Sequence, residues 1–141
     1  MTQANSQMRD FVERLIAHEA RGSKSSTTNS QAAFSVIAKL RPTLTNLMGS
    51  AGFSALLSRA LVLASKNVRW LEKLQVKSDG YLQGLDELAK QIDPVKLLEG
   101  QVALLVQLFG LLMAFIGEKL TLNLVLGVWP KLSLNDLDFS K

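Results

Sequence analysis

The chain contains no cysteine and a single histidine, His18, among its 141 residues. The lack of cysteine excludes disulfides, thiolate metal ligands and cysteine nucleophiles. A hydrolytic triad needs a nucleophile, a base and an orienting acid, and none is suggested here, because the one histidine is flanked by charge and no glycine-framed serine turn is present. The glycine-rich loops that bind phosphates or dinucleotides are missing as well. We therefore expect no enzymatic activity, no cofactor and no bound metal.

Charge is also scarce, because 20% of the residues are charged and 48% are hydrophobic, with a net charge of +4. This composition is ample for a folded core and excludes a chain that is disordered throughout. The polar residues 1–7 lack the apolar core of a signal peptide, which predicts a cytoplasmic protein. The length favours a single helical domain, with an N-terminal helix and mobile connector over 1–29, a helical core over 30–130 and a tail over 131–141.

Apolar residues recur at helical spacing through the N-terminal half of the chain. This pattern predicts a short amphipathic helix over 8–20, a second helix over 30–48 and a third over 53–73, with a tight corner at 49–52. Pro42 lacks a backbone donor and restricts the residue before it, so we expect a kink or a break there.

The pattern changes after this third helix. Residues 74–83 alternate apolar and polar side chains around Asp79-Gly80, which predicts a β-hairpin. Apolar residues up to Ile92 then suggest a brief helix. The predicted fold class is mainly α, a compact helical bundle of about five helices with a small β-hairpin insertion.

The last helical region is the central element of this predicted bundle. It starts at Asp93-Pro94, which combines an N-cap with proline at the first helical position. It extends toward Trp129, and we expect a break or kink near Gly117 or Gly127, since glycine is a poor helix former.

Small and weakly polar residues follow one another at intervals of 3 and 4 through this region, so on a helix they share one face. Small residues on a shared face let two helix backbones approach closely. The members of this small-residue face are Gly100, Ala103, Gln107, Gly110, Ala114, Gly117 and Thr121. The opposite face carries Leu105, Leu108, Phe109, Leu112, Phe115, Ile116 and Leu120. We expect the small-residue face to be an interface with a second copy or another protein.

The run from Gly100 to Gly117 carries no charge and reaches the length, about 18 residues, at which a membrane span becomes feasible. A buried helix of a soluble bundle is the main interpretation, and membrane insertion of 100–117 is the alternative. Gln107 lies in the middle of the run, and a buried amide must be hydrogen bonded. It either pairs with its counterpart in a second copy and fixes the register, or is satisfied within a monomeric core.

Basic residues form a second pattern. Arg59, Lys66, Arg69 and Lys73 recur at helical spacing, which places them on one helix face where an anionic partner could bind. Lys and Arg are also common on solvated helix faces, and no aromatic residues for base stacking are interleaved with them. The ordinary solvated face is therefore favoured over nucleic-acid binding.

His18 is followed by Arg21 three residues on and by Gly22 four residues on. The segment 15–23 resembles the phosphoacceptor helix of histidine phosphotransfer domains. The resemblance implies that His18 accepts a phosphoryl group in a phosphorelay. The alternative is an ordinary exposed histidine near the end of a helix.

Overall fold

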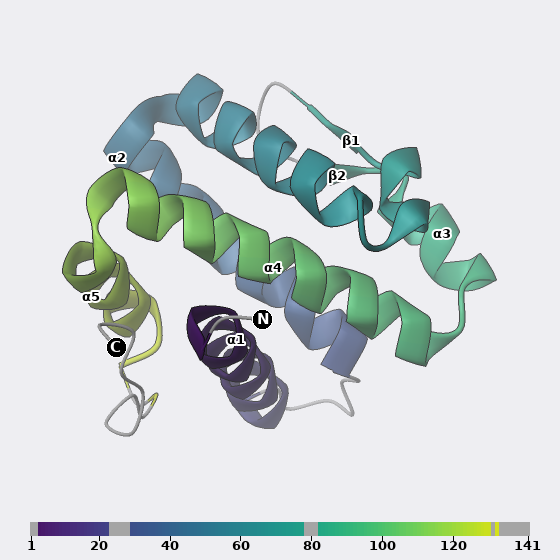
Figure 1. Cartoon of the computed structure of the whole chain (residues 1–141), viewed down its shortest axis with the longest axis horizontal. Coiled ribbons are helices and arrows are strands. Elements are labelled where there is room, and N and C mark those ends of the chain that lie inside the picture. Colours follow the sequence, from purple (N-terminus) through teal and green to yellow (C-terminus); the bar gives the residue numbers. More distant parts are fainter. Residues whose placement is uncertain (1–2, 23–28, 78–81, 131, 133–141) are drawn as a thin grey trace.

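The computed structural model describes residues 3–22, 29–77, 82–130 and 132, and this part of the chain is mainly helical. The elements are α1 (Gln3–Gly22), α2 (Asn29–Ser65), the 3₁₀ helix η1 (Arg69–Lys73), β1 (Gln75–Val76), β2 (Leu82–Gln83), α3 (Leu85–Gln91), α4 (Pro94–Ile116) and α5 (Glu118–Val128). The predicted mainly α class is confirmed. Figure 1 shows α4 crossing the middle of the molecule, with α1, α2 and α5 around it.

The predicted N-terminal amphipathic helix is confirmed as α1. Phe11, Val12 and Leu15 are fully buried, while Arg9 and Asp10 on the other side are exposed. The ring of Phe11 meets the ring of Phe109 on α4 edge to face, with centroids 5.0 Å apart and an interplanar angle of 79°. This geometry is favourable for aromatic pairs, so it anchors α1 on α4.

Helix α2 contains a sharp bend at Gly49, whose backbone dihedrals are φ 81° and ψ 161°. The predicted corner is confirmed, and glycine suits it because side chains disfavour positive φ. We call residues 29–48 the outward arm and residues 50–65 the return arm. In Figure 1 the outward arm passes behind α4, and the return arm runs along its upper side.

We expected a kink or a break at Pro42, and the break is wrong, because α2 continues through this residue and its non-helical dihedrals lie at Gly49. Proline deprives the carbonyl four residues earlier, that of Ala38, of its helical donor. Pro42 and Ala38 are both exposed. Water can therefore satisfy the freed carbonyl on this solvent side of the helix, and the helix is retained.

The helix predicted over 53–73 also ends earlier than expected. Helix α2 stops at Ser65, and the backbone N–H groups of Asn67 and Val68 both donate to the Ala64 carbonyl, at 3.1 and 3.0 Å. Val68 is extended, and η1 follows with Leu71 fully buried. The turn thus redirects the chain and lets Leu71 reach the core.

The two short strands pair antiparallel, with Gln75 opposite Gln83 and Val76 opposite Leu82. The expected turn at Asp79-Gly80 lies outside the described residues, so the hairpin stays a prediction. The proposed connector at 23–28 and most of the tail lie outside them too.

Candidate interaction surface on helix α4

Helix α4 begins and ends as its terminal residues dictate. The Asp93 carboxylate accepts a hydrogen bond from the Val95 backbone N–H at 3.4 Å, and Pro94 occupies the first turn. This confirms the predicted helix start. The predicted break is confirmed at Gly117, whose φ of 92° and ψ of 156° end α4 at Ile116 and start α5 in a new direction.

One side of α4 forms the centre of the core. Its buried large side chains are Leu104, Leu105, Leu108, Phe109 and Leu112. The expected apolar face extends further, but Phe115 and Leu120 are 71% and 43% exposed. The expectation that this whole face is buried is wrong at its C-terminal end, because the chain changes direction at Gly117 and leaves these side chains uncovered.

The expectation that these seven residues share one helix face is wrong at the C-terminal end, because α4 ends at Ile116, Gly117 is its non-helical C-cap and Thr121 belongs to α5. The first and the last of the seven are occupied within the chain. Gly100 is buried, and a Cβ atom added to it would lie 2.2 Å from Cζ2 of Trp70. Only glycine therefore lets this indole lie directly on the helix backbone. At the other end Thr121 is buried, and its hydroxyl donates to the Gly117 carbonyl at 2.8 Å.

Between these ends the small-residue face is open. Ala103, Gln107 and Gly110 are half-buried, and Ala114 and Gly117 are exposed. A Cβ atom added to Gly110 or to Gly117 would meet no atom within 4 Å. We call these residues (Ala103, Gln107, Gly110, Ala114 and Gly117) the open α4 face. They lie on the most apolar helix of the chain or, in the case of Gly117, at its C-cap, and the described structure covers them only in part.

A groove of about 330 Å³ crosses α4 at one end of this open face. It lies between α1, α4 and the turn after α2, and its lining residues are Arg9, Asn67, Val68, Glu99, Ala103, Val106 and Gln107. Arg9 and Glu99 are its charged members, one of each sign. The remaining lining residues are uncharged.

The structure differs from expectation about which glutamine is buried. Gln101 is only 2% exposed, whereas Gln107 is half-buried at the groove. Gln107 therefore keeps access to a partner. Helical spacing alone could not decide between the two, because it does not show which neighbours cover each face.

The basic residues expected on one helix face lie on two elements. Arg59 is in α2 and Lys66 follows its last residue, whereas Arg69 and Lys73 belong to η1. All of them are exposed. The expectation of one continuous helix face is therefore wrong, because α2 ends at Ser65.

His18 is half-buried on α1, and the helix ends at Gly22. Its phosphoacceptor role stays a prediction.

The neighbouring Glu19 has a structural role that the sequence does not reveal. One of its carboxylate oxygens accepts hydrogen bonds from Lys39 Nζ at 2.8 Å and from Trp129 Nε1 at 2.9 Å. This carboxylate joins α1 to the outward arm and to the residue after α5, which are too far apart in sequence for a local pattern to indicate.

Within the described ranges, two helical segments are long and apolar enough to cross a membrane, Ser35–Ser65 and Pro94–Ile116. This is weak support for a membrane span, since core helices of soluble proteins meet the same criteria. In the same part of the chain, no group of three His, Asp or Glu side chains is placed to hold a metal ion.

Searches with this chain match no protein-family model, no curated protein and no solved structure.

Proposed function

We propose that this protein is a non-catalytic interaction module that self-associates through the open α4 face. The observation that carries the proposal is that small, uncharged residues of the central apolar helix remain accessible along the open α4 face. On another side of the same helix Phe115 is 71% exposed, and exposed apolar side chains of this size are typical of protein interfaces.

The residue types on the open α4 face favour a second helix as the contact. Helix axes normally pack 8–10 Å apart, depending on the side chains at the contact, and small residues allow the shorter distances. In a two-fold dimer each α4 contributes the same residues. Gln107 of one copy then meets Gln107 of the other near the crossing point, and the amides satisfy each other while fixing the register.

The absolute mass of the purified protein, measured by size-exclusion chromatography with light scattering and without detergent, tests this proposal. We expect a dimer for the wild type and a monomer for Gly110→Leu, because the new side chain keeps the two backbones apart. The first atom of the new side chain meets no described residue in a single copy, since none has an atom within 4 Å of the Cβ position.

Gly127→Leu on α5 is the matched control. Gly127 is exposed and, like Gly110, has no described atom within 4 Å of its Cβ position, but it lies outside the open α4 face. We expect this variant to stay dimeric. A monomeric wild type, or a dimer that survives Gly110→Leu, contradicts the proposal.

A second candidate function is insertion of residues 100–117 into a membrane. The apolar character of Pro94–Ile116 favours it. In the most apolar window of this helix, 50% of the residues are buried in the structure. In this alternative α4 would exchange its contacts with α1 and α2 for lipid. Protection of the segment from protease after mixing with vesicles would support insertion, and unchanged cleavage would exclude it.

We also propose the finer features of the architecture and the setting. The chain forms one domain of about five helices with a small hairpin around residues 74–83, and it acts in the cytoplasm as a homo-oligomer or with a protein partner. The antiparallel pairing of β1 with β2 supports the hairpin.

A further inference from the structure

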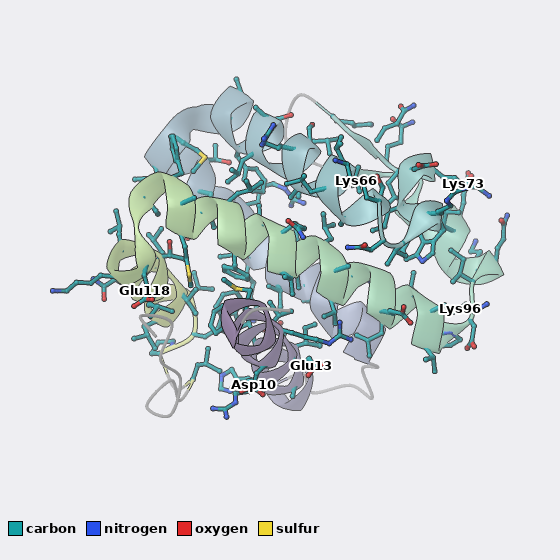
Figure 2. The ribbon with its side chains drawn as sticks, viewed as in Figure 1. Asp10, Glu13, Lys66, Lys73, Lys96 and Glu118 are labelled. Atoms are coloured by element: carbon teal, nitrogen blue, oxygen red, sulfur yellow. The ribbon has the colours of Figure 1, made fainter. Side chains whose placement is uncertain are left out.

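Charge is unevenly distributed along this chain. Between Glu19 and Glu72 every charged residue is Lys or Arg, and there is no Asp or Glu. This acid-free stretch includes all of α2. Figure 2 shows Lys66 of this stretch in the upper part of the molecule and Asp10 and Glu13 on α1 at its lower edge.

The return arm of α2 exposes one complete helix face. Its members recur at intervals of 4, 4, 3 and 4, and all are exposed: Ala51, Ala55, Arg59, Val62 and Lys66. We call this set the α2 outer face. Val62 is 59% exposed although it is a large apolar residue. The face thus combines apolar side chains with two cations and has no acid.

The end of β1 adds another cation beside this face. The Ser54 hydroxyl donates to the Lys77 carbonyl at 2.8 Å, which holds Lys77 alongside the return arm, and the Lys77 side chain is exposed. In η1 the exposed residues Arg69, Glu72 and Lys73 together add one net positive charge beyond the end of α2.

These cations differ from those in the N-terminal part of the molecule. On α1, Arg9 pairs with Glu13 at 3.3 Å and Arg14 with Asp10 at 3.2 Å. Within the described residues, by contrast, none of the cations of the α2 outer face or its surroundings forms an ion pair: Arg59, Lys66, Arg69, Lys73 and Lys77. Their positive charge is therefore available to an external anion.

We propose that the α2 outer face docks on the surface of an anionic phospholipid bilayer. An interfacial helix needs an apolar face at the acyl boundary and cations that reach the headgroups. Here Val62 and the alanines supply the apolar contact, and Arg59 and Lys66 extend their chains to the phosphates. A nucleic acid would use the cations but would leave Val62 without a partner.

The docking is independent of self-association, because it uses α2 rather than the open α4 face. The test is co-sedimentation of the full-length protein with vesicles of phosphatidylcholine alone or mixed with phosphatidylglycerol. We expect binding only to the anionic vesicles, and we expect added salt to weaken it. The double variant Arg59→Gln/Lys66→Gln should lower the partition coefficient roughly 30-fold, since each cation near an anionic surface contributes about a factor of five.

The matched control is Lys96→Gln/Lys119→Gln, which removes the same charge from exposed positions on α4 and α5. We expect it to keep binding within about threefold of wild type, because electrostatic attraction falls off within a Debye length. Circular dichroism checks that both variants are folded.

Three results would overturn the proposal. The first is no binding to anionic vesicles. The second is an equal loss of binding in the two double variants. The third is binding of duplex DNA that exceeds vesicle binding and is unchanged by Val62→Ser, which would assign the cations to a nucleic acid instead.

Discussion

Substituting alanine at Gly100 and at Gly110 should change stability in opposite directions, although both glycines lie in the interior of α4 and on the same side of it. Alanine in place of glycine favours a helix by about 1 kcal/mol. A Cβ atom on Gly110 meets nothing within 4 Å, so Gly110→Ala should stabilise the fold by about that amount.

At Gly100 the same Cβ atom would lie 2.2 Å from Cζ2, 2.7 Å from Cε2 and 3.1 Å from Cη2 of Trp70. The rigid indole must move as a whole, because these atoms cannot shift separately. Its buried Nε1 has no hydrogen-bond partner among the described residues, so packing rather than hydrogen bonding holds the ring in place. Overpacking of this kind costs about 1–3 kcal/mol.

The helix-propensity gain is common to both variants and cancels in their comparison. Gly100→Ala should therefore unfold with a free energy about 1–3 kcal/mol below that of Gly110→Ala. Urea denaturation followed by circular dichroism measures this difference. It should be repeated at two protein concentrations, because self-association would add to the apparent stability.

A third substitution isolates the cause. In a Trp70→Leu background the indole is absent, so adding Gly100→Ala should now stabilise the helix as Gly110→Ala does. Equal stabilities of the two alanine variants, or a Gly100→Ala penalty that persists without Trp70, would refute the reasoning.

Two further substitutions test contacts that the structure identifies. Glu19→Ala removes the acceptor of the Trp129 indole N–H and should lower the free energy of unfolding by about 1–3 kcal/mol in urea denaturation. The control Glu13→Ala breaks only an exposed ion pair with Arg9 and should lower this free energy by less than about 0.5 kcal/mol. Equal losses would show that Glu19 does not hold the end of α5. Gly117→Ala places a side chain on a residue with a φ of 92°, and this strain should lower the thermal midpoint of unfolding although the described residues leave space for the added Cβ atom. An unchanged midpoint would show that the α4–α5 junction tolerates other conformations.

Local chemistry accounts for the features of this fold that could be predicted. The N-cap at Asp93, the proline after it, the bend at Gly49 and the break at Gly117 each depend on one residue and its near neighbours. The amphipathic spacing of α1 depends on the neighbouring turns of one helix. Such features are visible in a sequence because the interactions that cause them are short in range.

The features that escaped prediction depend on distant residues or on solvent. Pro42 was expected to interrupt a helix, but it lies on the solvent side, where water replaces the lost donor. The helix over 53–73 was expected to be continuous, but burial of Leu71 is achieved after a turn that follows Ser65. Neither the solvent side of a helix nor the destination of a leucine can be read from spacing alone.

The small-residue face shows the same limit in its most consequential form. Its spacing correctly indicates that one side of α4 admits a close approach, but it cannot indicate what approaches. At Gly100 the approach is made by Trp70 from the same chain, and its position follows from the early end of α2. At Gly110 no atom of the described residues lies within 4 Å of the Cβ position, so this space is open to a second molecule. A change of oligomeric state in a Gly100 variant would therefore be explained by a disturbed monomer. If Gly110→Leu has an unfolding free energy no lower than that of the wild type, the same change in this variant indicates a contact between molecules.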